Sequence, residues 1–131
     1  MKILIAEDDF TCRMLLQELL KGYGTTHVAA NGREALAAAG ASIESGEPYD
    51  LVCMDIMMPE MDGQQAVAEI RAMEVAAGVA PGKGTKIVMT TALGDMKNIM
   101  NAYGNLCDGY LVKPIRKDAL AGELRKLKLV E

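Results

Sequence analysis

The sequence predicts an α/β fold in which helices cover both faces of a parallel sheet. Short, continuous apolar runs alternate along the chain with longer segments whose apolar residues recur at helical spacing. These runs lack the polar alternation of strands that have one solvated face, so they suit strands that are buried on both sides. A chain of 131 residues, of which 50% are hydrophobic and 24% are charged, is large enough for one core. We therefore expect a single domain over residues 1–131.

Four apolar runs are expected to be strands, and a fifth segment is a weaker candidate. The runs are too short for helices and are rich in Ile, Val and Leu. They cover residues 3–6, 51–54, 87–89 and 110–112, and the weaker segment covers residues 26–29.

Helical periodicity fills the segments between these runs. Gly22 is expected to end the first helix, because glycine commonly terminates helices. Asn31 and Asp62 are expected N-caps, since their side chains can accept hydrogen bonds from free backbone N–H groups. The expected helices cover residues 10–21, the segment after Asn31 with Ala35, Leu36 and Ala39, and residues 64–77, 96–103 and 118–127.

Strand and helix alternate five times in this prediction, which favours parallel strands joined by right-handed crossovers. Five strands in a chain of this length fit the flavodoxin-like, doubly wound (βα)5 sheet with strand order 2-1-3-4-5. Periodicity alone does not distinguish this order from the other common one. In either case the carboxyl ends of the strands share one edge of the sheet.

Charged and polar side chains follow several of the expected strands. Asp8 and Asp9 follow the first strand, and Asp55 follows the third. Thr91 follows the fourth strand and Lys113 the fifth, so all five side chains are expected at one edge. Carboxylates this close repel one another, and a Mg²⁺ ion together with an ammonium group would compensate them. Because a carboxylate in such surroundings can accept a phosphoryl group, we predict that Asp55 is phosphorylated.

Four motifs, in order and at these spacings, resemble the response-regulator receiver domain of two-component signalling. They are AEDDF, MDIMMPEMDG, MTTA and GYLVKPI. The resemblance covers the chain from Lys2 to the last expected helix. It implies the same strand order and a stand-alone, chemotaxis-Y-like receiver with no output domain.

The resemblance also implies roles for individual residues. Asp55 is the phosphoacceptor, and Mg²⁺ is held by Asp8, Asp9, Asp55 and the backbone carbonyl of Met57. Glu7 is expected to lie on the solvent side or behind these ligands. The apolar side chains of Met57 and Leu93 would flank the phosphoryl group, and we hypothesise that they hinder an attacking water.

The same resemblance assigns the binding of phosphoryl oxygens to Thr91 and Lys113. Tyr110 would be the switch aromatic that moves inward when Thr91 is drawn to the phosphate, although a plain core role for Tyr110 stays open. The Lys113–Pro114 peptide bond is expected to be cis.

The function implied is that of a phosphoacceptor rather than a conventional enzyme. A sensor histidine kinase or phosphotransfer protein would supply the phosphoryl group from a phosphohistidine, and the receiver would catalyse its own phosphorylation and dephosphorylation. The signal would pass to a downstream protein effector, with the receiver either a monomer or a dimer that forms on activation. An apolar patch is expected to make that contact, formed by Met96, Ile99, Met100, Tyr103 and Ile115.

Three other functions compete with this one. A Mg²⁺-dependent phosphatase or phosphotransferase with an Asp nucleophile would carry a second acid two residues later, where this chain has Met57. A flavin- or nucleotide-binding module would need a Gly- or Ser/Thr-rich phosphate loop after the first strand. A receiver that only binds is disfavoured, because all the acceptor-site residues are present.

The composition excludes several further classes of protein. A net charge of −4 argues against a nucleic-acid surface, and three widely spaced cysteines form neither a disulfide framework nor a zinc site. No segment approaches the roughly 20 apolar residues of a membrane span, so we expect a soluble, cytoplasmic protein. The single histidine, His27, lies on the weak strand and is not expected to be a phosphodonor or a ligand.

Overall fold

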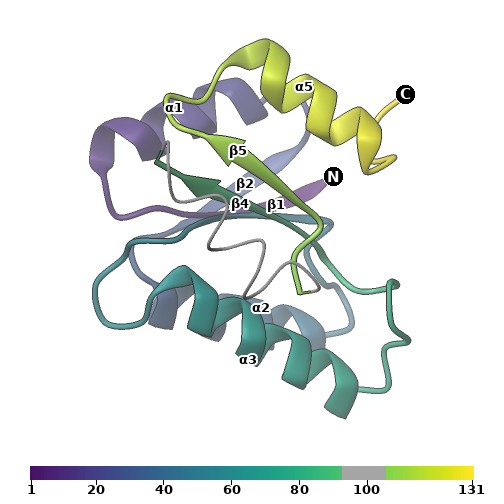
Figure 1. The fold of residues 1–131 in the computed structure, drawn as a ribbon. Coiled ribbons are helices and arrows are strands. Elements are labelled where there is room, and N and C mark those ends of the chain that lie inside the picture. The colour runs from purple at the N-terminus through teal and green to yellow at the C-terminus, as the bar shows by residue number, and fades with distance from the viewer. Residues whose placement is uncertain (93–105) are drawn as a thin grey trace.

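The computed structural model describes residues 1–92 and 106–131, which build a parallel sheet between two layers of helices (Figure 1). All neighbouring strands pair in parallel, and their order is 2-1-3-4-5, as predicted. The strands are β1 (Lys2–Ala6), β2 (Thr25–Ala29), β3 (Leu51–Asp55), β4 (Lys86–Thr91) and β5 (Gly109–Val112).

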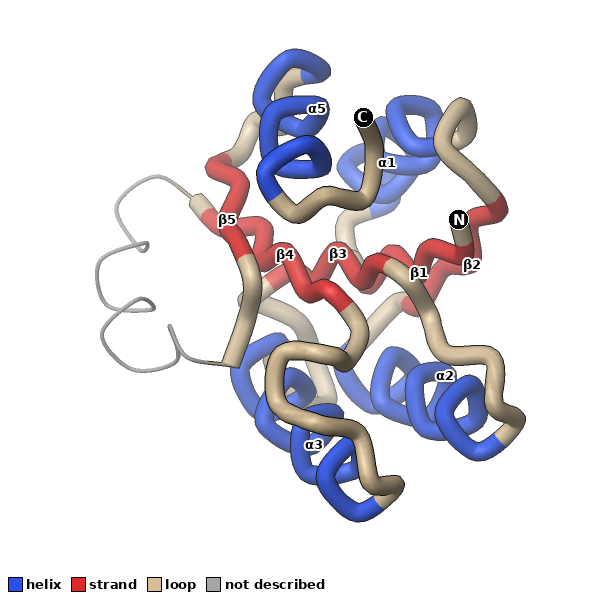
Figure 2. The backbone as a smooth tube through the Cα atoms, turned by 90° about the vertical axis from the view of Figure 1, so that its right-hand side faces the viewer, coloured by secondary structure: helices blue, strands red, loops and turns tan. Residues whose placement is uncertain are grey.

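The helices cover the sheet from both sides. Figure 2 shows α1 and α5 on one face and α2 and α3 on the other. The predicted caps are confirmed: Asn31 Oδ1 accepts from the Glu34 amide at 2.8 Å, and Asp62 Oδ1 from the Gln65 amide at 2.9 Å. The predicted helix over residues 96–103, with Leu93 and the patch residues Met96, Ile99, Met100 and Tyr103, lies outside the described residues. The described helices are α1 (Phe10–Leu20), α2 (Gly32–Glu44), α3 (Gly63–Ala76) and α5 (Lys117–Lys126).

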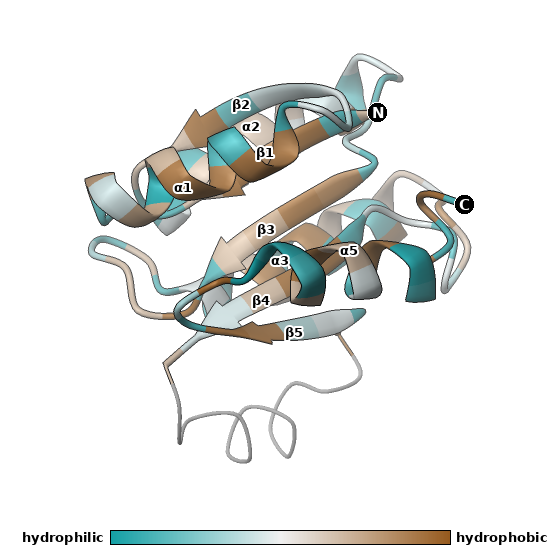
Figure 3. Cartoon of the chain, turned by 90° about the horizontal axis from the view of Figure 1, so that it is seen from above, coloured by the Kyte–Doolittle hydropathy of each residue, from teal (hydrophilic) through white to brown (hydrophobic). Residues whose placement is uncertain are grey.

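The core consists of one apolar cluster on each face of the sheet. Successive strand residues alternate between them, so that Leu4 packs under α2 and α3 while Ile5 packs under α1 and α5. The central strand β3 is buried at every position, and Figure 3 shows apolar colouring along β1 and β3. The edge strand β2 is mostly exposed, which explains its weak apolar signal in the sequence.

One predicted side-chain position is wrong. Ile115 was expected on an exposed patch, but it is buried in the cluster beneath α1 and α5. On α1 the buried residues are Leu16 and Leu20, whereas Met14 and Leu15 are exposed. This helix therefore presents apolar side chains to solvent.

Other expectations from the sequence are confirmed. The described cysteines form no disulfide bond, and the Lys113–Pro114 peptide bond is cis. Among the described helices, none combines the length and apolarity that a membrane crossing requires.

Candidate functional site

An ammonium group lies between two buried carboxylates at the carboxyl edge of the sheet. Lys113 Nζ donates a hydrogen bond to Asp55 Oδ1 at 3.1 Å and lies 2.8 Å from Glu7 Oε1. Glu7 directly follows β1, Asp55 ends β3, and Lys113 directly follows β5. Because β1 and β3 are neighbours in the sheet, their final residues bring the two carboxylates together.

Of the two positions predicted for Glu7, on the solvent side or behind the ligands, the solvent side is wrong. Its exposed fraction is 0%, and that of Asp55 is 4%. The Glu7 amide donates to the Ala29 carbonyl at 3.0 Å, which continues the pairing of β1 with β2 by one residue. The Asp9 amide donates to Glu7 Oε2 at 3.2 Å, and Arg13 donates to the Glu7 carbonyl at 3.0 Å. Glu7 is therefore a fixed, inward-facing member of the site.

Asp9 has a different position from the one expected for a metal ligand. Its Oδ1 accepts hydrogen bonds from the Thr11 amide at 2.8 Å and the Cys12 amide at 3.2 Å, so that Asp9 caps α1. The acidic group that the structure brings together consists of Glu7, Asp8 and Asp55. We therefore propose Glu7 and Asp8 as the pair of acids beside Asp55, in place of the predicted pair of Asp8 and Asp9. An acid directly before a predicted helix is a strong N-cap signal, and that signal distinguishes Asp9 from its neighbours.

The pKa values of the two buried carboxyl groups, Glu7 and Asp55, are shifted in opposite directions. Burial raises the pKa of Asp55, and the neighbouring Glu7 carboxylate raises it further, to about 7. Burial also acts to raise the pKa of Glu7, but its interactions with Asp55 and with the Lys113 ammonium outweigh burial and lower the pKa to about 2. Burial acts to lower the pKa of Lys113, and the two carboxylates outweigh this effect and raise it. One ammonium group is therefore too little positive charge for two fully ionised carboxylates.

The residues present fit a hard divalent cation. Each of Glu7, Asp8 and Asp55 offers a carboxylate oxygen, and these oxygens lie within 4.8 Å of one another. Glu7 Oε1 is buried, and its contact with Lys113 is an ion pair without the alignment of a hydrogen bond. Asp8 is exposed, which leaves the solvent side open for the waters and phosphate oxygens that Mg²⁺ prefers. A Mg²⁺ ion would also supply the missing positive charge.

The remaining predicted residues occupy the same edge. Thr91 ends β4 and is buried, and its hydroxyl donates to the Ala92 carbonyl at 3.3 Å. Asp55 pairs with Thr90 in the sheet, which places Thr91 one step beyond the acceptor. Tyr110 lies on β5 next to Met89, and burial together with a hydrogen bond to Cys107 raises the pKa of its phenol. The side chain of Met57, two residues after Asp55, is 73% exposed.

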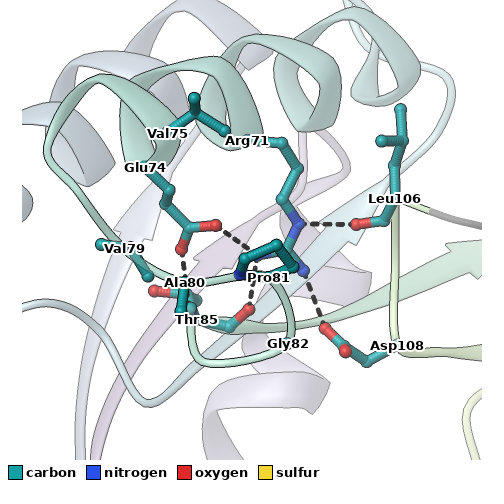
Figure 4. A pocket seen from close by; sticks show the side chains of 11 residues that line it. Arg71, Glu74, Val75, Val79, Ala80, Pro81, Gly82, Thr85, Leu106 and Asp108 are labelled. Carbon is teal, nitrogen blue, oxygen red and sulfur yellow. Dashed lines mark hydrogen bonds and ion pairs between the residues drawn. The ribbon is translucent and has the colours of Figure 1, made fainter.

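A second polar network lies at the opposite edge of the sheet, and the sequence analysis missed it (Figure 4). Arg71 of α3 donates to the Leu106 carbonyl at 2.7 Å and to the Thr85 carbonyl at 2.9 Å. It also pairs with Glu74 at 2.7 Å and with Asp108 at 2.8 Å. A cavity of about 240 Å³ lies beside it, far from the acidic group. Because the guanidinium is saturated by protein partners, we interpret this network as structural.

Comparisons with known proteins agree with this geometry. Residues 3–125 match the family model described as the response regulator receiver domain. The chemotaxis protein CheY of Bacillus subtilis (strain 168) is 31% identical over 130 residues, which is 95% of each chain. The transcriptional regulatory protein TcrA of Mycobacterium tuberculosis is 33% identical over 127 residues, and this chain spans 45% of its length.

One solved structure extends the comparison to a complex. It is the co-crystal structure of the Saccharomyces cerevisiae histidine phosphotransfer signaling protein Ypd1 and the receiver domain of its downstream response regulator Ssk1. A chain of this structure matches with a TM-score of 0.80 at 26% identity, covering 97% of this chain and 88% of the other.

Proposed function

Because the chain belongs to the response-regulator receiver family of two-component signalling, we propose that it accepts a phosphoryl group on Asp55 and signals to a protein partner. The observation that carries this proposal is the placement of Asp55 beside the Lys113 ammonium and the carboxylates of Glu7 and Asp8. A cytoplasmic location, expected from the sequence, is part of the same proposal.

In the proposed reaction, an oxygen of Asp55 attacks the phosphorus of a phosphohistidine. The bond from phosphorus to oxygen forms, the bond from phosphorus to imidazole nitrogen breaks, and the donor leaves as a neutral histidine after proton exchange. Mg²⁺, held by Glu7, Asp8, Asp55 and the Met57 carbonyl, would neutralise charge on the phosphoryl oxygens when bound. The products are an acyl phosphate on Asp55 and a dephosphorylated donor.

The protein's own residues prepare and stabilise this step. Lys113 favours the ionised, nucleophilic form of Asp55 and can pair with a phosphoryl oxygen once Asp55 is esterified. Glu7 holds the ammonium group in place from the other side, at 2.8 Å. The Thr91 hydroxyl can exchange its contact with the Ala92 carbonyl for a hydrogen bond to the phosphoryl group. That exchange would begin the switch that includes Tyr110.

The structure also supports a location for the phosphodonor. Phe10 and Met14 lie one helical turn apart on α1, and 64% and 52% of their areas are exposed. The residue before α1, Asp9, lines a 390 Å³ pocket together with Lys113 and Ile115. We propose that the donor docks on this apolar face of α1, from which its phosphohistidine reaches Asp55.

The competing functions have less support. A phosphatase with an Asp nucleophile needs a general acid near the acceptor, and the residue two positions after Asp55 is Met57. A receiver that only binds has no need for a buried acceptor flanked by an ammonium group and an acidic triad.

Incubation with acetyl phosphate and Mg²⁺, followed by intact mass measurement, tests the proposal. We expect a gain of one labile phosphoryl group in the wild type and in Asp118→Ala, whose exposed carboxylate lies outside the site. We expect no gain in Asp55→Ala or when EDTA replaces Mg²⁺. A gain that persists in Asp55→Ala, or no gain in the wild type, would contradict the proposal.

A further inference from the structure

The loop that follows Asp55 is enclosed by two glycines that contact its backbone. At Gly63, which begins α3, a Cβ atom would overlap the carbonyl oxygen of Asp55. At Gly32, which begins α2, a Cβ atom would overlap the carbonyl oxygen of Met61 and lie 2.7 Å from its carbonyl carbon. The N-terminus of α2 therefore touches the loop backbone directly, and only glycine leaves space for this contact.

Hydrogen bonds join this loop to strand β4 and join the two ends of the loop to each other. The Ile56 amide donates to the Thr90 carbonyl at 3.2 Å, and the Gly63 amide donates back to the Ile56 carbonyl at 2.9 Å. Within the loop, the Met61 amide donates to the Pro59 carbonyl at 2.8 Å. We expect a displacement of Met61 to reach Met57 through Pro59, whose carbonyl accepts from the Met61 amide.

One backbone angle shows that the surroundings set the conformation of this loop. Glu60 adopts a φ of 70°, in the left-handed region that residues with side chains seldom occupy. Such a conformation persists where neighbouring structure supports it. The ion pair of Arg33 with Glu60 is long, at 3.6 Å, and both side chains are largely exposed, so it contributes little. The backbone contact at Gly32 is the stronger support from α2.

We propose that Gly32 is a positioning residue for the phosphoacceptor site. By allowing α2 to support Met61, it holds the loop so that the Met57 carbonyl can complete the magnesium site. This inference rests on the proposed function. Mg²⁺ demands near-ideal octahedral geometry, and ligand distances in metal sites hold to within about 0.2 Å. Alanine at position 32 would displace the loop by more than this, since real Cβ atoms essentially never approach within 3.0 Å.

The chain offers a closely matched control. At Gly24 a Cβ atom would overlap the carbonyl oxygen of Met1 and also lie 2.7 Å from its carbonyl carbon. Gly24 directly precedes β2, at the sheet edge opposite the acidic group. Gly24→Ala thus introduces a comparable backbone overlap away from the site.

Calorimetric titration with Mg²⁺ alone compares the variants. We expect the Mg²⁺ dissociation constant of Gly32→Ala to rise about tenfold, within the range found when supports of metal ligands are removed. The Mg²⁺ dissociation constant of Gly24→Ala should stay within about twofold of wild type, because distant sites without shared partners couple by only about 0.3–0.5 kcal/mol. In EDTA, hydrogen exchange of residues 56–63 should be faster in Gly32→Ala than in Gly24→Ala.

The phosphorylation kinetics provide a second measurement. With acetyl phosphate, Gly32→Ala should need more Mg²⁺ for half-maximal rate but approach the wild-type rate at saturating Mg²⁺. If Gly32→Ala does not fold, the double variant Gly32→Ala with Glu60→Gly is used, because glycine at position 60 lets the loop move away from the added Cβ atom. The double variant should still bind Mg²⁺ more weakly than the single variant Glu60→Gly.

The outcomes separate this inference from the proposed function. An unchanged Mg²⁺ affinity in folded Gly32→Ala, or in the double variant, would overturn the inference. An equal loss in Gly24→Ala would overturn it as well. A wild type that neither binds Mg²⁺ nor gains a phosphoryl group would instead contradict the proposed function, and the exchange comparison in EDTA would still report on the loop.

Discussion

Two buried carboxylates share one ammonium group at the carboxyl edge of the sheet, and under the proposed function this imbalance of charge prepares the site for a cation. Glu7 keeps its charge and fixes Lys113, while Asp55 has its pKa raised by burial and by the Glu7 carboxylate. A cation that joins this group relieves the repulsion and frees Asp55 as a nucleophile. The roles of the two carboxylates thus follow from their surroundings rather than from their residue type.

The residue two positions beyond the acceptor is expected to control the lifetime of the phosphoryl group. Met57→Asn replaces an exposed, apolar side chain by one that can hydrogen-bond a water, so we expect faster dephosphorylation. An increase of about threefold or more corresponds to a barrier lowered by at least about 0.6 kcal/mol. The loss of the phosphorylated mass after removal of acetyl phosphate measures the rate.

Val75→Asn is the matched control for this change, because Val75 is also 73% exposed and lies on α3. An unchanged rate in Met57→Asn would argue that Met57 does not shield the acyl phosphate.

Among the elements, α1 joins the site to a surface that a partner can contact. Asp9 caps its first turn beside Glu7, and the same helix presents Phe10 and Met14 to solvent. The N-cap of α1 and the proposed docking face for the phosphodonor therefore lie at the same end of this helix. The acidic group and the proposed docking face cannot move independently.

If the donor docks on α1, Phe10→Ala combined with Met14→Ala should slow transfer from a phosphorylated histidine phosphotransfer protein. Loss of two exposed apolar contacts is expected to reduce the transfer rate by about tenfold, or about 1.4 kcal/mol. The rate with acetyl phosphate, which needs no docking face, should stay the same. A parallel loss with both donors would show that the substitutions damage the site itself.

The Arg71 network joins α3 to the start of β5, the strand that leads to Lys113. Arg71→Ala would remove the guanidinium hydrogen bonds to the Leu106 and Thr85 carbonyls and both ion pairs. The two carboxylates would each keep one backbone N–H donor. We expect the free energy of unfolding to fall by about 2–4 kcal/mol. Urea unfolding measures this value. Arg116→Ala, which removes an exposed ion pair with Asp118, should change it by less than about 1 kcal/mol.

At the scale of the whole molecule, the buried carboxyl groups make stability depend on pH. The ordinary pKa of Asp55 is 3.8, and in the folded protein it is about 7. At pH values between these two, and in EDTA, Asp55 binds more protons in the folded state than in the unfolded state. Stability therefore falls as pH rises through this interval. Glu7 acts in the opposite direction at lower pH, because its lowered pKa contributes stability that is lost as pH falls from about 4.5 toward 2.

We expect the metal-free protein to be more stable at pH 5 than at pH 8, by a free energy of unfolding on the order of 2 kcal/mol. Urea unfolding at the two pH values measures the difference. Asp55→Asn should remove most of it, and saturating Mg²⁺ should reduce it by compensating the carboxylates at pH 8. Equal stability of the wild type at both pH values would contradict the assignment of a raised pKa to Asp55.

Much of this architecture could be predicted because its determinants are local or follow from topology. Apolar runs define the strands, and alternation with helices makes the strands parallel, so the polar residues at their ends must meet. Asp55, Lys113 and Thr91 could be assigned to one edge in this way. The resemblance to receiver domains then added roles that spacing alone does not provide.

The doubly wound sheet and the edge at which the acids gather follow from the sequence, since both depend on patterns that extend over many residues. The N-cap pattern distinguishes Asp9, but the folded structure was needed to show that Glu7 rather than Asp8 turns inward, because that choice depends on where β1 stops and α1 begins. The folded structure also decided that Ile115 is buried and that Arg71 meets Asp108. These contacts join residues distant in sequence, and a shift of one residue changes the direction of a side chain, which no local pattern records.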